Sequence, residues 1–160
     1  MTLDALVPMS QEEFAGYAIE SVRNFAAGKA RAGQWPRGEA LKLAKKTFGQ
    51  LLPEGLATPG HWLFNIVDTE GRKVGVLWMA KQMHGSEEVA YVYDVVIGEN
   101  HRRQGHAQRA FAAVEAKARE LGLAGVALHV FGHNTDAQSL YAKLGFTPTS
   151  IHVFKALPAS

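Results

Sequence analysis

The sequence predicts an α/β protein with a mixed sheet, on three observations. Segments rich in β-branched and aromatic residues alternate with segments whose apolar residues recur every three or four positions, as on one face of a helix. Three strand-like segments follow one another, and the third of them begins a strand–helix–strand unit, so both antiparallel and parallel pairing are expected. The length of 160 residues, with 47% hydrophobic and 20% charged residues, fits one globular domain over 1–160.

Ten elements are expected, in the order strand, helix, helix, strand, strand, strand, helix, strand, helix, strand. They cover residues 2–8, 11–30, 38–51, 61–68, 73–83, 89–97, 103–121, 126–131, 135–144 and 146–155.

The N-terminal third is predicted to hold a short edge strand and two helices. Ser10 and Glu13 have the spacing of a capping box, in which each side chain accepts a hydrogen bond from the other residue's backbone N–H. The breaker segment Ala32–Pro36 separates the two helices. The run Pro53–Gly60 holds two prolines and two glycines and ends the second helix in a loop.

The middle of the chain is predicted to form a hairpin and a third strand. Thr69–Arg72 supplies the turn between the first two strands. After a break at His84–Ser86, the run Val89–Ile97 is rich in valine and tyrosine, which favour strands.

The C-terminal part is predicted to alternate helices with strands. The first of its helices carries apolar residues spaced by four, three, four and three positions, at Ala107, Phe111, Val114, Ala118 and Leu121. Asn134 can cap the next helix, and Gly145 suits the position just after its end. The apolar segment Phe146–Lys155 then reads as a last strand.

Composition argues against several functional classes. The formal net charge of +2 is too small for a nucleic-acid-binding surface. The chain has no cysteine, which excludes disulfides, thiolate metal ligands and a cysteine nucleophile. Acidic residues interrupt any signal-like run near the N-terminus, and no apolar stretch approaches the roughly 18 residues of a membrane span. We expect a cytoplasmic protein without a membrane or nucleic-acid partner.

A loop with phosphate-binding character lies between a predicted strand and a predicted helix. A helix start leaves backbone N–H groups unpaired and carries the positive end of the helix dipole, so it attracts phosphate. Glycine allows a close backbone approach or a positive φ. The alternative is an ordinary turn, since the loop lacks the three glycines of a dinucleotide fingerprint and the Gly-Lys-Ser/Thr of a P-loop. The loop consists of Arg102, Arg103, Gln104, Gly105, His106 and Ala107.

Two motifs in this region together resemble the GNAT family of N-acetyltransferases. The first is Tyr93-Asp94-Val95-Val96-Ile97 followed by Arg102-x-x-Gly105-x-Ala107, which matches that family's acetyl-CoA signature. The second is Asn134 followed by Leu140-Tyr141-x-x-Leu144-Gly145-Phe146. The motifs lie within residues 88–147, and the rest of the chain resembles small uncharacterised bacterial members, notably at 128–134.

The resemblance implies a fold, a co-substrate and a way to bind it. The implied fold is a mixed central sheet of about six to seven strands flanked by about four helices. Acetyl-CoA would be the co-substrate, with no metal. The backbone of Val95, Val96 and Ile97 would pair with the pantetheine arm, and an amide near Val96 would polarise the thioester carbonyl. The amides of 103–107 would hold the pyrophosphate. Asn134 and Tyr141 would complete the cofactor site.

The resemblance also suggests candidates for proton transfer. Tyr141 matches the tyrosine that protonates the leaving thiolate, although it also lies on the apolar face of its helix. His129 and Asp94 lie on strand positions where some members carry a base. Each has a plainer interpretation, a structural histidine and a capping or turn aspartate. Tyr91 stands where another branch has a glutamate, so the sequence leaves the base open.

The expected function is transfer of an acetyl group from acetyl-CoA to a primary amine, directly within a ternary complex. A non-catalytic acyl-CoA sensor of the same fold and, more weakly, a nucleotide-binding module are the alternatives. His129 and His133 do not have the spacing and partners of a metal site. The loop Gly28–Arg37 carries three cations and favours an anionic or neutral acceptor, such as an amino acid or a peptide N-terminus. A homodimer is left open.

Overall fold

The central sheet has five strands in sequential order, and its pairing is mixed as the sequence predicted. The computed structural model describes residues 4–159. Antiparallel pairs join β1 to β2, β2 to β3 and β3 to β4, while β4 and β5 are parallel. The strands are β1 (Leu6–Pro8), β2 (His61–Val67), β3 (Lys73–His84), β4 (Glu87–Ile97) and β5 (Val126–Leu128).

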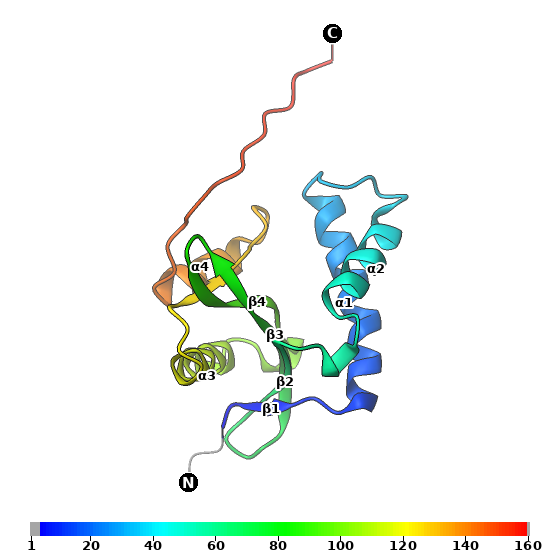
Figure 1. The fold of residues 1–160 in the computed structure, drawn as a ribbon. Helices are drawn as coiled ribbons and strands as arrows, with labels where there is room; N and C mark the ends of the chain where they lie inside the picture. Colours follow the sequence, from blue (N-terminus) through cyan, green and yellow to red (C-terminus); the bar gives the residue numbers. More distant parts are fainter. Residues whose placement is uncertain (1–3, 160) are drawn as a thin grey trace.

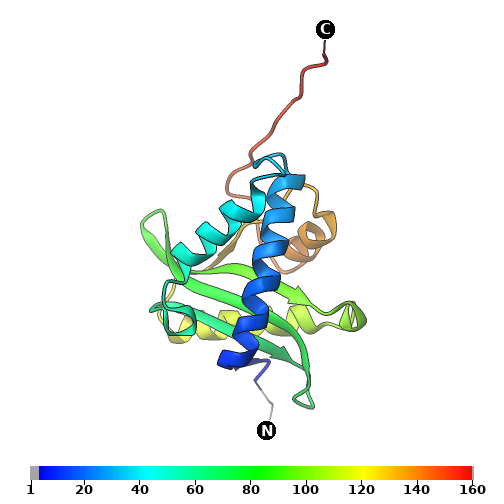
Figure 2. The ribbon, with the colours of Figure 1, turned by 90° about the vertical axis from the view of Figure 1, so that its right-hand side faces the viewer.

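Four helices cover the two faces of this sheet (Figures 1 and 2). Helices α1 (Gln11–Arg31) and α2 (Ala40–Leu51) pack together on one face, and α3 (His106–Glu120) and α4 (Thr135–Lys143) lie on the other. Short 3-10 turns precede β2 and α3. None of the helices between residues 4 and 159 is both long and apolar enough to cross a membrane.

Each face of the sheet has its own apolar core. On the α3 side, Phe111 and Val114 are fully buried against Ile66, Leu77 and Met79 of the strands. On the other side, a separate cluster brings α1 and the end of α2 onto β2 and β3, through Met9, Tyr17, Leu52, Leu63 and Trp78. Residues of β3 therefore contribute to both cores, as expected for a central strand whose side chains alternate between faces.

The predicted caps of α1 and α4 are confirmed. The Glu13 N–H donates to Ser10 Oγ at 3.2 Å, and the Ser10 N–H donates to Glu13 Oε1 at 3.0 Å, which completes the capping box. Asn134 caps α4 by accepting a hydrogen bond from the Ala137 N–H at 3.3 Å. Gly145 follows α4 with φ of 94°, the left-handed conformation that glycine adopts without strain.

The prediction of a last strand at Phe146–Lys155 is wrong for the single chain. Residues 147–159 are extended but pair with no other segment of the described chain, and they run away from the body (Figures 1 and 2). The sheet accordingly has five strands, fewer than the six to seven expected. Residues 2 and 3 of the first predicted strand lie outside the described part. A β-prone pattern records propensity, but a strand also needs a neighbouring edge, which the pattern cannot specify.

Two boundaries next to the predicted site also differ from prediction. Helix α3 begins at His106 instead of Arg103, because Gly105 takes a left-handed conformation with φ of 82°. Strand β5 ends at Leu128 instead of Phe131.

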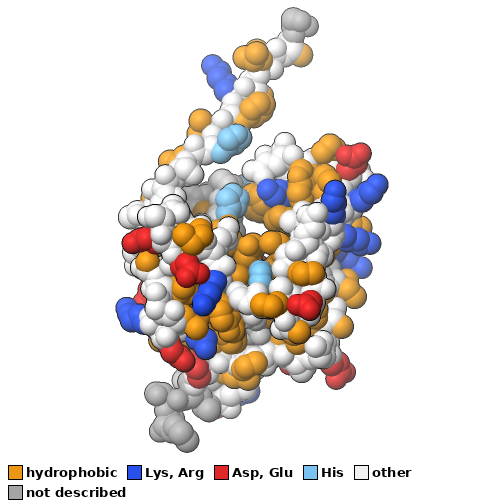
Figure 3. Space-filling view, viewed as in Figure 1, with side chains coloured by type: hydrophobic (Ala, Val, Ile, Leu, Met, Phe, Trp, Pro, Cys, Tyr) orange, Lys and Arg blue, Asp and Glu red, His pale blue; other side chains and the backbone are white. Residues whose placement is uncertain are grey.

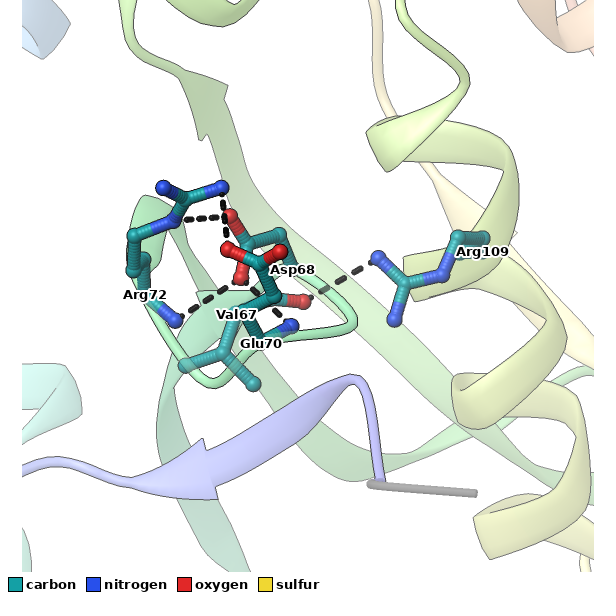
Figure 4. Close-up of polar contacts among 5 residues, drawn as sticks. All are labelled: Val67, Asp68, Glu70, Arg72 and Arg109. Carbon is teal, nitrogen blue, oxygen red and sulfur yellow. Dashed lines mark hydrogen bonds and ion pairs between the residues drawn. The ribbon is translucent and has the colours of Figure 1, made fainter.

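Polar contacts fix the β2–β3 turn, and one arginine of α3 bonds to the strand just before it (Figure 4). Backbone N–H groups of Arg72 and Glu70 each donate to Asp68 at 2.9 Å, and with the Arg72 side chain they lower the pKa of Asp68 to about 2. Just before this turn, Arg109 of α3 donates to the carbonyl of Val67 at 3.1 Å. The pairing register between β2 and β3 shifts at Val67. Arg109 therefore donates to a carbonyl where the β2–β3 hydrogen-bond ladder is irregular. The contact ties the first turns of α3 to the sheet.

Candidate active site

Strands β4 and β5 separate halfway along β4. Ala90–Val92 pairs with Val126–Leu128, where β5 ends, whereas β4 continues to Ile97. Within residues 4–159, no strand lies beside the last part of β4 on this side. The separation leaves a stretch of extended backbone available to a ligand.

The open side of β4 presents backbone polar groups. The Gly98 N–H donates to the carbonyl of Val74 at 2.8 Å, across the β3 side. Because hydrogen-bonded positions alternate along an antiparallel ladder, Val95 and Ile97 turn their N–H and C=O groups to the opposite, open side. The Ile97 carbonyl already accepts a hydrogen bond from Arg102 Nε at 3.1 Å, and a carbonyl oxygen can accept a second.

The loop that follows β4 has the backbone of an anion-binding nest. Gly105 has φ of 82°, and Arg103 has φ of 61°, the one positive value found outside glycine in the described chain. Alternating left- and right-handed residues aim successive N–H groups into one concavity. The Gly105 carbonyl accepts from the Arg109 N–H at 3.1 Å, so α3 begins here and its first N–H groups lack helical partners.

The space over this loop is open. A Cβ built on Gly105 would meet no atom within 4 Å. Glycine is therefore favoured here by the positive φ, and not by a lack of space for a side chain. The side chain of Gln104 donates to the Asn100 carbonyl at 3.3 Å, which steadies the loop from within. The buried Nδ1 of His106 has no hydrogen-bond partner among the described residues. With Arg102 and Arg103 exposed where the loop begins, the loop fits a pyrophosphate group in charge, donors and room.

Asp94 lies on the α1 side of β4 and is paired with a residue that the sequence analysis did not single out. The Tyr17 hydroxyl donates to Asp94 Oδ2 at 2.7 Å. Burial raises the pKa of Asp94, and the nearby charge of Glu20 raises it further, while hydrogen bonds from Tyr17 and Val95 oppose the shift. Asp94 therefore has neither the capping nor the turn role that was its alternative.

A cavity of about 320 Å³ lies beside this aspartate. Tyr17, Glu20 and Asn24 of α1 line one side of it, and Asp94 lines the other with residues of β3 and the end of β4. The cavity carries two carboxylates, with one lysine, Lys73, at its border. Such a site favours a cationic group, for example a protonated amine.

The Tyr141 ring of α4 packs against other aromatic rings, and its hydroxyl is close enough to Asp94 for the carboxylate charge to affect its pKa. Its ring meets Phe111 and Phe146 edge-to-face, each with centroids 5.6 Å apart. Burial raises the pKa of Tyr141, and the charge of Asp94 adds to the shift. The phenol of Tyr141 is therefore protonated at neutral pH.

His129 lies in a different environment, just after β5. Its ring contacts Phe131 edge-to-face at 5.2 Å. Partial burial lowers the pKa of His129, and the charge of Lys29 on α1 lowers it further. Between residues 4 and 159, His129 makes no side-chain hydrogen bond, either to Asp94 or Tyr141 or of the kind that fixes a structural histidine. His133 stacks on the same Phe131, and no group of three or more metal-ligating side chains occurs between residues 4 and 159.

The remaining aromatic candidates of β3 and β4 pack against one another. Trp78 stacks on Tyr93 at 4.6 Å, and Tyr91 meets Tyr93 edge-to-face at 4.7 Å. Trp78 also donates to Nδ1 of His61 at 3.0 Å. Sequence reasoning missed Tyr17 and Glu20, whose contacts with Asp94 span more than seventy residues. The available signal was a tyrosine hydroxyl on an otherwise apolar helix face.

Comparison with known proteins agrees with this geometry. A model of the acetyltransferase (GNAT) family matches residues 20–146. The uncharacterized N-acetyltransferase YycN of Bacillus subtilis (strain 168) is 38% identical over 152 residues, covering 95% of this chain and 97% of the relative. Aminoglycoside N(6')-acetyltransferase type 1 of Serratia marcescens is 31% identical over 129 residues, covering 78% of this chain and 85% of that protein.

A solved structure supports the same assignment. The crystal structure of YycN from Bacillus subtilis aligns with a TM-score of 0.89 at 37% identity, covering 96% of this chain and 98% of that one. The family model and these relatives span most of the chain, including the open edge of β4 and the loop before α3. The chain belongs to the GNAT family of acetyltransferases.

Proposed function

We propose that the protein is an N-acetyltransferase that moves an acetyl group from acetyl-CoA to a primary amine, directly and within a ternary complex. The observation that carries the proposal is the continuity of one strand. The open edge of β4 runs from the nest at Arg103–Ala107 back to Asp94, and Asp94 is close to Tyr141. Acetyl-CoA, when bound, supplies the acetyl group as a thioester and leaves as a thiol.

The cofactor would be held mainly by backbone groups. The N–H groups of Arg103–Ala107 would bind its pyrophosphate, and the backbone of Val95–Ile97 would pair with its extended arm. Asn134 would act by fixing the first turn of α4 beside that arm, since its side chain caps this helix. This mode of binding agrees with a loop whose left-handed residues and open space suit a phosphate group.

Two side chains would move protons. An ordinary amine has a pKa near 10 and must lose a proton before it can attack. Asp94 would accept that proton, because its raised pKa makes it a stronger base than an exposed aspartate. Tyr141 would return a proton to the leaving thiolate. His129, neutral at pH 7 because its pKa is lowered, is a second candidate for the base.

The distribution of charge favours an acceptor with two different ends. The carboxylates of Glu20 and Asp94 would attract the amine, while Arg31 at the end of α1 and Arg37 in the loop that follows are exposed. Gly28 lies in the last turn of α1, because the helix runs to Arg31 and takes in the first residues of the predicted loop 28–37. It is so close to Phe131 that an added Cβ would come within 2.6 Å of its ring, and the C-terminal end of α1 is therefore next to the segment that follows β5. An amino acid or a peptide N-terminus would match both charges better than a polycation.

A panel of amines, incubated with acetyl-CoA under continuous detection of free thiol, tests this function. Amino acids, peptides, spermidine and an aminoglycoside should be included, with product identity read from the 42 Da gain expected for an acetyl group, roughly the mass of C₂H₂O. Amine-dependent thiol release and sequential kinetics are expected. Tight acetyl-CoA binding without turnover on any amine would support a sensor instead. Parallel double-reciprocal plots would contradict direct transfer.

A further inference from the structure

The hydroxyl of Tyr17 reaches across the interior of the molecule to the candidate base. Tyr17 lies near the start of α1, is only 9% exposed, and packs its ring in the apolar cluster that contains Trp78. Its hydroxyl donates to Asp94 Oδ2 at 2.7 Å, across 77 positions of sequence. A phenylalanine would fill the same space, so this hydroxyl calls for an explanation beyond packing.

Asp94 lies at an irregular point of the sheet. The pairing register of β3 and β4 shifts between Trp78 and Met79, and Asp94 is the residue that pairs with Trp78. An irregularity of this kind re-aims a side chain away from the regular alternation of a strand. The direction of the Asp94 carboxylate is therefore fixed in part from outside the sheet, by the hydrogen bond from Tyr17 of α1.

The surroundings of Asp94 strengthen this bond. On the strand side, the cavity beside Asp94 is lined by Val74, Gly75, Val76 and Val96. Figure 3 shows the molecule hollowed between the α1–α2 layer and the α3–α4 layer, with hydrophobic side chains around much of the hollow. Where water competes less, a hydrogen bond to a carboxylate is stronger than at the surface.

We propose that Tyr17 is a positioning residue, whose hydroxyl holds the Asp94 carboxylate in the orientation in which it takes the proton of the acceptor amine. The inference rests on the proposed function, in which Asp94 is the base. The proton passes from the nitrogen of the ammonium group to a carboxylate lone pair that Tyr17 does not occupy. The Tyr17 O–H bond stays intact, and Tyr17 acts only through Asp94.

The buried hydroxyl is suited to hold a carboxylate and not to replace it. Burial raises the pKa of Tyr17 well above its ordinary value, and the charge of Asp94 raises it further, while a hydrogen bond with Ser21 opposes the rise. The phenol is therefore protonated at neutral and mildly alkaline pH. A hydroxyl that keeps its proton remains a donor, but it cannot itself act as the base.

Other titratable groups around Asp94 act on it differently. Glu20, one turn along α1, is exposed, and its charge raises the pKa of Asp94. Lys73 of β3 and His101 of the turn before α3 line the same cavity. Tyr141 of α4 is near enough for the charge of Asp94 to act on its pKa. Glu20 offers a variant of opposite sign, since removing a like charge lowers a carboxyl pKa, whereas removing a hydrogen bond to the ionised form raises it.

Carbon-13 NMR of the aspartate carboxyl groups tests the inference in the free protein, without any turnover. The chain has four aspartates, and Asp94→Asn identifies the resonance of Asp94. In Tyr17→Phe the titration midpoint of Asp94 should move up by about one pH unit, as expected for the loss of one hydrogen bond to a charged group. Glu20→Gln should move the midpoint down, by an amount that added salt reduces. The matched control is Tyr93→Phe, which removes a hydroxyl bonded to Gln82 from a ring of the same cluster and should leave the midpoint in place.

Steady-state kinetics over a range of pH then show whether the held carboxylate matters for transfer. With an acceptor found in the amine panel, the acidic limb of kcat/KM should move to higher pH in Tyr17→Phe by the same amount as the NMR midpoint. Above this limb, kcat should stay about tenfold below wild type with the acceptor KM nearly unchanged, because the base is ionised but no longer held in place. Tyr93→Phe should keep the wild-type profile. Both variants keep an aromatic ring and should keep the circular dichroism of wild type.

The possible results separate this inference from the proposed function. An unchanged Asp94 midpoint in Tyr17→Phe would overturn the inference, because the hydroxyl would then not hold the ionised carboxylate. A shifted midpoint with a wild-type pH profile and plateau rate would overturn it too, and would leave Tyr17 with a structural role. If the midpoints shift as expected but no amine is acetylated, the proposed function is overturned, and with it the catalytic purpose of the contact.

Discussion

Asp94 is the residue at which the separate parts of this site meet. It lies where the pairing register between β3 and β4 shifts. It also accepts a hydrogen bond from Tyr17 of α1, and its charge raises the pKa of Tyr141 on α4. Three segments far apart in sequence thus converge on one carboxylate. Burying a carboxylate costs folding free energy. A buried group that lowers stability without a structural benefit is typical of a functional site.

Replacing Asp94 with asparagine should stabilise the protein at neutral pH while reducing its activity. The folded-state pKa of Asp94 is raised above the ordinary value of 3.8, so the folded state binds the proton more tightly than the unfolded state. The stability that this confers is complete below 3.8 and is lost as pH rises through the folded-state pKa. Asparagine does not ionise, so the variant loses no stability as the pH rises through this range.

Urea unfolding of both proteins over a range of pH measures this difference. Asp94→Asn should be the more stable protein above the window and equal to wild type below it. Wild-type turnover should also fall as pH drops through the raised pKa. A variant that is less stable by the same amount at every pH would show that Asp94 is a structural hydrogen-bond acceptor.

Tyr141→Phe separates the two interpretations of this tyrosine, since it keeps the ring against Phe111 and Phe146. If the hydroxyl protonates the thiolate, turnover should fall by about 10²–10⁴, the usual contribution of a general acid, with little change in cofactor affinity. Steady-state rates and calorimetry give the two values. Tyr93→Phe, which removes a hydroxyl bonded to Gln82 at 3.3 Å, is the matched control. Full activity of Tyr141→Phe would leave packing as its only role.

At the scale of elements, the site depends on where β5 stops and where α3 starts. Both are local conformational events: β4 runs on beyond its parallel neighbour, and a left-handed glycine begins the helix. The contact of Arg109 with Val67 then holds the start of α3 in place on the sheet.

Gly105→Glu should abolish coenzyme A binding, because it puts a side chain and a negative charge over the nest. Gly122→Glu is a closely matched control. Gly122 follows the other end of α3, also has positive φ (73°), and also has open space around it. Both substitutions should lower stability by a similar amount, about 1–2 kcal/mol for a non-glycine residue in this conformation. Only Gly105→Glu should lose affinity by calorimetry, and equal affinities would refute the phosphate site.

Local signals in the sequence were sufficient to predict most of the elements. The capping box at Ser10, the cap at Asn134 and the left-handed Gly145 all depend on neighbours within a few residues. The motif of the loop 102–107 likewise placed a helix start directly after a strand. The contact of Tyr17 with Asp94 could not be predicted, since it depends on how α1 crosses the sheet. The tail failed as a strand for a similar reason: its pattern does not say which edge it meets.

For the whole molecule, charge is separated between the cavity and its surroundings. Carboxylates face the cavity beside β4, whereas the last turn of α1, which carries cations, lies next to Phe131, just after β5. Lys29 is partly engaged there, since it donates to Gln34 at 2.8 Å and lies over the rings of Phe25 and Trp35.

Reversing the loop charges should therefore weaken acceptor binding more than catalysis. Lys29→Glu with Arg31→Glu should raise the acceptor KM about tenfold for an anionic or neutral acceptor, and added salt should shrink the difference. Lys42→Glu with Lys45→Glu on exposed positions of α2 changes net charge equally and serves as the control. A preference of the wild type for spermidine, or equal effects of the two double variants, would show that the loop does not select the acceptor.

The central claim is that the open edge of β4 and the nest before α3 form one acetyl-CoA site. A backbone amide NMR titration with coenzyme A tests it most directly, because it reports each N–H group separately. The amides of Val95, Ile97 and Arg103–Ala107 should show the largest shifts, and all should saturate with a single Kd. If these amides stay unchanged while coenzyme A binds and shifts another set, the site is elsewhere and the account is wrong.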